Sequence, residues 1–314
     1  MFIVNTLAPL VFLVVLGIIV RSTGFAPKCF FENLNRLVYW ITLPALLFYK
    51  LAQASINWSS AVWLIGLLFG GAFLTLFFSL IVGLMFRLPA PSLSSFMQGS
   101  FRGNLAFIGL PVVLFALAEG NGLHSEHVQT IAVLGLAPII PLYNIVSVII
   151  LMVGQETNGQ SFWDRAKVMT AGVASNPIVV ACFAGIAFSF IRLSLPVLIA
   201  RPLNIIGQTS LPLALIAIGA SLNLRAVRGH SYKATAAGLI KVAAAPLVLF
   251  WINTLVAIPQ PEYQIAQLYL ACPTAVSSYV MAQKLGADAS LAGSIIVAST
   301  ILSLPAFIFV LSVI

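Results

Sequence analysis

A hydrophobic stretch that is broken near its middle constrains this chain more than any other feature. Residues 99–120 read GSFRGNLAFIGLPVVLFALAEG, which is long and apolar enough to cross a membrane. Its first half nevertheless carries Arg102, Gly103, Asn104, Gly109 and Pro111. Proline removes a backbone N–H and clashes with the carbonyl four residues earlier, and glycine loosens a helix. Breaks at membrane depth are tolerated where the freed backbone groups face protein or water. We therefore predict a discontinuous helix that lines a transport site, with Pro111 at the first position of its second half.

The composition is that of a polytopic membrane protein. Of 314 residues, 61% are hydrophobic and only 7% are charged, whereas soluble domains carry about 25% charged residues. The net charge of +8 comes from cations spread through the predicted loops, so we interpret it as an orientation signal and not as a nucleic-acid-binding surface. The cysteines stand alone in or beside apolar stretches, so neither a metal site nor a cofactor is predicted: Cys29, Cys182 and Cys272.

Ten membrane spans are predicted, at about 20 apolar residues per span. They lie near 3–22, 32–51, 59–86, 94–117, 129–152, 168–190, 202–222, 232–258, 264–284 and 289–313. Residues 1–152 form a first five-helix half, 153–167 a short connection, and 168–314 a second half. The odd-numbered loops hold nine Lys and Arg residues against three in the even-numbered loops. By the positive-inside rule the odd-numbered loops are cytoplasmic, and both termini lie on the non-cytoplasmic side of the cell membrane.

The two halves repeat each other in the positions of their prolines and glycines. Three matches share an offset of 168 residues: Pro9 with Pro177, Gly17 with Gly185, and Pro44 with Pro212. Two more prolines match at similar offsets, Pro111 with Pro273 at 162 and Pro141 with Pro305 at 164. Because each half has five spans, the repeat is inverted. The predicted fold is an all-α secondary-transporter architecture whose fourth and ninth spans are broken near the membrane midplane.

The two breaks gather candidate substrate-binding groups. Helix N-termini at Pro111 and Pro273 present unpaired N–H groups that attract carboxylates. Neutral hydrogen-bonding side chains stand near these positions, namely Asn104, Thr274, Ser277 and Ser278. A proline kink without a ligand is the alternative interpretation.

Positive charges also lie inside the predicted spans. Charged residues within a membrane are costly and commonly functional. Lys241 lies deep in the eighth span, so its ammonium either contacts the transport site, or it snorkels to the membrane surface or bonds to helix-end carbonyls. Arg36 and Arg102 present a similar choice, and snorkelling to the membrane surface is favoured for Arg102. All seven acidic residues lie at span ends or in loops, so no buried carboxylate is expected and the predicted substrate is an anion.

A possible metal-binding pattern lies outside the spans. His124, Glu126 and His127 have a spacing compatible with metal ligands, but we interpret them as part of a solvated loop. The glycosylation pattern at Asn57 is given no role.

The segments RGNLAFIGLP (102–111) and CPTAVSSYVMAQKLGAD (272–288) resemble the auxin efflux carrier family. Its bacterial members are annotated malonate or malate permeases, and its plant members are the PIN auxin exporters. The spacing of Asn104 and Pro111 is similar to the fourth helix of that family, and the second segment is similar to its ninth. The segments GLIKVAAAPLV, around Lys241, and AIGASL (217–222) also look like family features, so the likeness covers nearly the whole chain.

The resemblance implies the crossover fold of sodium–proton antiporters and bile-acid symporters. Spans 1, 2, 6 and 7 would form a scaffold, through which a homodimer is plausible, and spans 3–5 and 8–10 a transport domain that moves as an elevator. Asn104, Pro111 and Pro273 would flank the substrate carboxylate. The chain lacks the long cytoplasmic loop of the plant carriers. Cys272 also stands where a second proline or a leucine commonly precedes the proline of the ninth helix.

The predicted function is therefore secondary transport of small organic anions, such as malonate, malate or auxin-like weak acids, through the lipid bilayer. An intramembrane enzyme is the alternative, although no HExxH, paired-acid or nucleophile–base pattern lies within the spans. A channel-like protein is a third interpretation.

Overall fold

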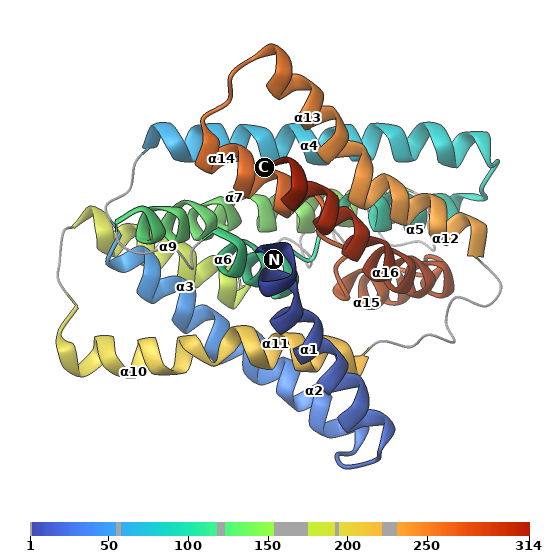
Figure 1. Ribbon diagram of the computed structural model, residues 1–314. Coiled ribbons are helices and arrows are strands. Elements are labelled where there is room, and N and C mark those ends of the chain that lie inside the picture. Colours follow the sequence, from blue (N-terminus) through green and yellow to red (C-terminus); the bar gives the residue numbers. More distant parts are fainter. Residues whose placement is uncertain (1, 55–57, 118–122, 154–174, 192–194, 222–230) are drawn as a thin grey trace. The chain divides into compact units, whose positions relative to one another are not determined.

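A computed structural model describes residues 2–54, 58–117, 123–153, 175–191, 195–221 and 231–314 (Figure 1). Within these ranges the regular secondary structure is helical, apart from one isolated β-bridge between Gly103 and Thr274. Residues 154–167 of the predicted connection and the Asn57 pattern lie outside the described residues.

The chain divides into two compact units. The first comprises Met1–Val62, Ala106–Ala137 and Ala174–Leu222, and the second comprises Trp63–Leu105, Pro138–Val173 and Asn223–Ile314. The first unit thus contains the predicted spans 1, 2 and 7, most of the sixth, and parts of the third, fourth and fifth. The assignment of whole spans to a scaffold and a transport domain stays a prediction.

Helix pairs build the first unit. Its helical segments are α1 (Phe2–Ser22), α2 (Lys28–Leu37), η1 (Val38–Thr42), α3 (Leu43–Ala52), α6 (Leu110–Leu117), α9 (Pro177–Phe190), α10 (Val197–Gln208) and α11 (Ser210–Ser221). A further helix, α7 (Leu123–Val153), begins in this unit and ends in the second. α1 packs against α11, and α3 packs against α9 and α10 (Figure 1).

Glycines at matched positions allow these helices to approach closely. Gly17 on α1 faces the carbonyl of Ile216 on α11, and an added Cβ would overlap that oxygen. Gly185 on α9 faces the carbonyl of Phe48 on α3, where an added Cβ would lie 3.0 Å from the oxygen. Gly185 lies 168 residues after Gly17, and Ile216 lies 168 residues after Phe48. The predicted repeat therefore relates the contact between Gly17 and Ile216 to the contact between Gly185 and Phe48.

The second unit is held together by apolar packing between its helices. Its helical segments are most of α4 (Trp58–Met85), α5 (Ala90–Phe101), α12 (Ser231–Leu239), η4 (Ile240–Ala244), α13 (Ala245–Leu255), α14 (Gln260–Leu270), α15 (Ser277–Lys284) and α16 (Ala289–Val313). α12 packs against α5 and α16, and α15 packs against α16 (Figure 1). One buried cluster joins α5, α12 and α16: Leu88, Phe96, Ala234, Ala237, Leu291, Ile295 and Ala298. Its alanines permit the close helix contacts that membrane proteins favour.

Three π-helices precede prolines by the same distance. Each ends two residues before a proline: η1 before Pro44, η2 (Leu105–Gly109) before Pro111, and η4 before Pro246. At η1, the N–H of Leu43 donates to the carbonyl of Val38, five residues back. In an α-helix the proline ring clashes with the carbonyl four residues earlier, and the wider π-turn relieves that clash. These prolines therefore loosen their helices without ending them.

Helices occupy most of the described residues in each of the ten predicted spans. Among those residues, five helical stretches are long and apolar enough to cross a membrane by length and composition: Trp58–Met85, Glu126–Val153, Val197–Ser221, Ser231–Leu255 and Ala289–Val313. These stretches agree with a polytopic membrane protein, and α16 has the same bounds as the predicted tenth span.

The beginning of α7 differs from the prediction. The helix starts at Leu123 and not near residue 129, so His124, Glu126 and His127 lie in its first turns. The prediction of a loop for these three residues is wrong. A carboxylate in the first turn stabilises the positive end of a helix dipole, and Glu126 occupies such a position.

Candidate functional site

Two broken stretches of the second unit pair with each other. The first lies between α5, which ends at Phe101, and η2, which begins at Leu105. The second lies between α14, which ends at Leu270, and α15, which begins at Ser277. Gly103 and Thr274 form an antiparallel bridge between them.

Backbone hydrogen bonds flank this bridge on both sides. The N–H of Asn104 donates to the carbonyl of Pro273 at 2.8 Å, and the N–H of Ala275 donates to the carbonyl of Arg102 at 3.0 Å. Helix breaks leave backbone groups without their usual partners, and these groups must be satisfied inside a protein. The two breaks therefore satisfy part of each other's backbone requirement.

The breaks do not lie where the prolines predicted them. Pro273 lies within the non-helical stretch, four residues before α15. Pro111 is the second residue of α6, which follows η2 without a gap. The prediction that both prolines begin a second half-helix, at equivalent positions, is wrong. The π-turn of η2 accommodates Pro111, and the chain leaves helical geometry earlier, at Arg102.

Side chains supply further bonds at the crossing. The hydroxyl of Thr274 donates to the carbonyl of Gly99 at 2.7 Å, and the N–H of Thr274 donates to Oγ of Ser299 at 3.0 Å. The thiol of Cys272 donates to the carbonyl of Asn104 at 3.1 Å. Thr274 was predicted as a substrate ligand, and in this structure its hydroxyl donates its proton to a carbonyl in the last turn of α5.

Lys241 lies next to both breaks. It is only 1% exposed, and its Nζ donates to the carbonyl of Leu270, the last residue of α14, at 3.0 Å. A Cβ added at Gly103 would lie 3.4 Å from the same Nζ. A cation at a helix C-terminus stabilises the negative end of the dipole. Of the two alternatives for Lys241, the structure shows the bond to a helix-end carbonyl.

Arg102 is buried, so the expectation that it snorkels to the membrane surface is wrong. It is 8% exposed. Its Nη2 donates to Oδ1 of Asn144 on α7 at 2.6 Å, and its Nη1 contacts the sulfur of Met281 on α15. Arg102 follows the last residue of α5, where the backbone becomes extended and directs the side chain into the unit.

Asn104 combines burial with an unused amide. It is 7% exposed, and both its backbone N–H and its carbonyl are bonded across the crossing. Its side-chain amide makes no hydrogen bond to another residue in the part of the chain that the structure describes. Neither amide atom is among the fully enclosed polar atoms that lack a partner in the described residues, so water or a small molecule can reach the amide. A ligand at the crossing would satisfy it.

The structure brings four of the predicted site residues together, namely Asn104, Pro273, Thr274 and Lys241. Ser277 is exposed at the first position of α15 in the same unit. The other three belong to the first unit, where Gly109 and Pro111 are buried and Arg36 is exposed in the last turn of α2. The substrate-binding role of all eight stays a prediction.

Sequence reasoning missed a buried carboxylate in the second unit. Glu262 lies in the first turn of α14 and is 3% exposed, and no hydrogen-bond partner for its Oε2 is present among the described residues. The expectation that no carboxylate is buried is therefore wrong. A position at a span end says nothing about tertiary burial, so no sequence signal marked it. The described ranges hold no group of three or more His, Cys, Asp or Glu residues placed for a metal.

Comparison with known proteins identifies the family. A family model described as membrane transport protein matches residues 2–311. The chain belongs to this family. Its resemblance to auxin efflux carriers is thereby confirmed, and it is a multi-pass membrane protein of a transporter family.

Two relatives are similar to this membrane transport protein over most of its length. A putative malonate transporter of Rhizobium meliloti (strain 1021) is 24% identical over 276 residues, which cover 86% of this chain and 82% of the relative. An uncharacterized transporter of Methanocaldococcus jannaschii is 22% identical over 298 residues, which cover 93% of this chain and 92% of the relative.

Proposed function

We propose that this membrane transport protein is a secondary transporter that carries small organic anions across the plasma membrane. The observation that carries the proposal is the pairing of two broken helices around the buried Asn104, whose amide has no partner among the described residues. Broken helices that meet in this way form the substrate sites of secondary transporters. Malonate-like and malate-like carboxylates, and auxin-like weak acids, are the proposed substrates.

The charge of the crossing supports an anionic substrate. Lys241 and Arg102 are both buried in the second unit; Lys241 donates to the carbonyl of Leu270, and Arg102 donates to Oδ1 of Asn144. A positive potential in a low-dielectric site attracts anions. The name of the relative from Rhizobium meliloti, a putative malonate transporter, points to the same class of substrate.

Alternating access by an elevator movement is part of the proposal. The division of the chain into two compact units supports it, because an elevator needs one body that carries the site and another that supports it. A homodimer formed through the supporting body would hold that body still in the membrane.

The test is transport by purified protein in liposomes. Malonate, malate and indole-3-acetate are added with and without proton or sodium gradients, and uptake and current are recorded. We expect a saturable uptake for one of these anions and its loss in Asn104→Ala, because the amide beside the break is removed. Asn204→Ala is the matched control, since Asn204 lies on α10 in the first unit and its side chain accepts a hydrogen bond from Gln208 on the same helix.

The same assay separates the alternatives. Chemically altered product inside the liposomes would indicate an intramembrane enzyme, and flux that never saturates would indicate a channel. Full uptake by Asn104→Ala would remove Asn104 from the site.

A further inference from the structure

A polar pocket lies in the first unit, and its lining includes no residue of the crossing. It has a volume of about 350 Å³ and is formed where α3 ends and α7 begins. All of its lining residues belong to Met1–Val62 or Ala106–Ala137. Pockets from about 300 Å³ upward hold small metabolites, so this one has room for a small ligand.

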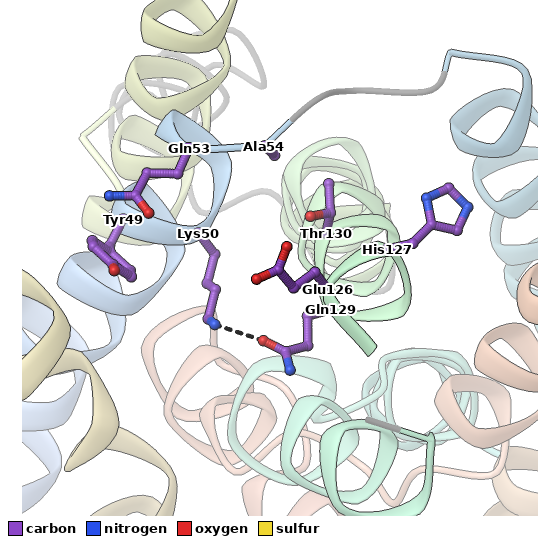
Figure 2. A pocket seen from close by; sticks show the side chains of 8 residues that line it. All are labelled: Tyr49, Lys50, Gln53, Ala54, Glu126, His127, Gln129 and Thr130. Atoms are coloured by element: carbon purple, nitrogen blue, oxygen red, sulfur yellow. Dashed lines mark hydrogen bonds between the residues drawn. The ribbon is translucent and has the colours of Figure 1, made fainter. Parts of the chain in front are cut away.

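Opposite charges line this pocket. Lys50 of α3 is half-buried, and its Nζ donates to Oε1 of Gln129 at 2.6 Å. Glu126 is exposed near the start of α7 and lies close enough to act electrostatically on Lys50. Figure 2 shows Lys50 directed toward Gln129, with the Glu126 carboxylate on the same side of α7.

The ammonium of Lys50 retains hydrogen-bonding capacity. An ammonium has three N–H donors, and its bond to Gln129 uses one of them. Gln53 and Thr130 also line the pocket and supply an amide and a hydroxyl. The imidazole of His127 points away from Lys50 (Figure 2), so it adds no second positive charge beside the ammonium.

The pair of charges selects a class of ligand. A dicarboxylate would place its second negative charge near Glu126, and a simple cation would be repelled by Lys50. A neutral ligand would displace water from both charges without replacing its bonds. A zwitterion satisfies both groups, because its carboxylate accepts from the ammonium and its own ammonium donates to the carboxylate.

We propose that this pocket binds a small zwitterion of the α-amino-acid type, with its carboxylate on Lys50 and Gln129 and its ammonium on Glu126. The site does not depend on the crossing of broken helices and does not require that the amino acid be transported.

The proposal is tested by calorimetric titration of the purified full-length protein in detergent. The probes are L-alanine, propionate, ethylamine and malonate, which carry both charges, only one of them, or two negative charges. We expect L-alanine to bind at millimolar concentration. Each of the other three should bind with an affinity lower by about tenfold or more, because each lacks one charged contact.

Variants assign the binding to the two charges. Lys50→Met and Glu126→Gln should each weaken L-alanine binding about ten- to a hundredfold. Lys284→Met, at the end of α15 in the second unit, and Glu32→Gln, on the exposed side of α2, are the matched controls and should bind normally. Glu126 is exposed, so its replacement leaves folding intact, and elution as a single peak in size exclusion checks this.

The titration is repeated with Asn104→Ala, where L-alanine should bind with unchanged affinity. This arm separates the pocket from the proposed transport site. The proposal is overturned if L-alanine gives no binding, if malonate binds more tightly than L-alanine, or if Glu126→Gln and Lys50→Met bind as the unchanged protein does.

Discussion

At the scale of single residues, the crossing depends on a few buried polar groups that compensate for lost helix geometry. Lys241 bonds to the end of α14, Thr274 bonds to the end of α5, and the backbone of Asn104 bonds to Pro273. Each of these groups acts on a broken stretch. We therefore expect substitutions here to change both stability and transport, whereas the amide of Asn104 should affect transport alone.

Lys241→Met should lower both the melting temperature and the rate of transport. The substitution keeps the apolar stem but removes the charge from the α14 C-terminus and leaves the carbonyl of Leu270 without its partner, at a cost of about 1–3 kcal/mol. Thermal unfolding in detergent measures the first effect and liposome uptake the second. Lys233→Met, on α12 of the same predicted span, is the control and should change neither. Normal stability in Lys241→Met would show that its bond to α14 is dispensable.

Thr274→Val should destabilise the protein by about 1 kcal/mol, because it removes the bond from the hydroxyl to the carbonyl of Gly99. Thr274→Ser keeps the hydroxyl and should retain most of the stability. Thermal unfolding of the two variants side by side measures the difference. If both variants unfold at the same temperature, the bond to Gly99 contributes nothing measurable.

At the scale of elements, close helix packing and π-helices that accommodate prolines determine how the helices are built. α1 meets α11 at Gly17, and α9 meets α3 at Gly185, so two helix pairs share one type of contact. Each π-helix stands two residues before a proline and keeps its span helical through the proline. Among the described residues, only the fourth and ninth of the predicted spans have several non-helical residues between two helical stretches.

Gly17→Ala should destabilise the first unit, because its Cβ would overlap the carbonyl of Ile216 on α11. Overpacking of this kind costs about 1–3 kcal/mol. Gly66→Ala on α4 is the control, since an added Cβ there meets no atom within 4 Å. Fluorescence-detected size exclusion after heating compares the two. Equal stability of both variants would mean that α1 and α11 can separate at no cost.

At the scale of the whole molecule, two compact units and an asymmetric distribution of cations are consistent with an oriented carrier. The first unit contains the glycine-mediated helix pairs and the α3–α7 pocket, and the second contains the crossing. The predicted orientation rests on the loops, because Lys and Arg are enriched in the cytoplasmic loops of membrane proteins.

Both termini are predicted on the non-cytoplasmic side. An alkaline phosphatase fused after Ile314 should be active, and a green fluorescent protein at the same place should be dark. Fusions after Arg87, in a predicted cytoplasmic loop, are the control and should give the opposite result. A fluorescent C-terminal fusion would invert the predicted topology.

Local properties of the sequence suffice to predict much of this fold. Span length and apolar composition depend only on neighbouring residues, so helices occupy most of the described residues of the predicted spans, and α16 agrees with its predicted bounds. The offset of 168 residues that matched Gly17 with Gly185 also relates their two helix contacts. A break in the fourth span was also predicted, but at Pro111 and not at Arg102, where the chain leaves helical geometry.

Tertiary structure alone decided how the breaks are placed and satisfied. A proline ends a helix only if the turn before it cannot widen, so Pro111 did not mark the break that pairing with the ninth span created at Arg102. Burial depends on which elements pack together, which is why Glu262 at a span end is buried and Arg102 turns inward. Sequence therefore determined where helices form, whereas contacts between distant segments determined the partners of Lys241 and Thr274 and left the amide of Asn104 without a hydrogen bond to another described residue.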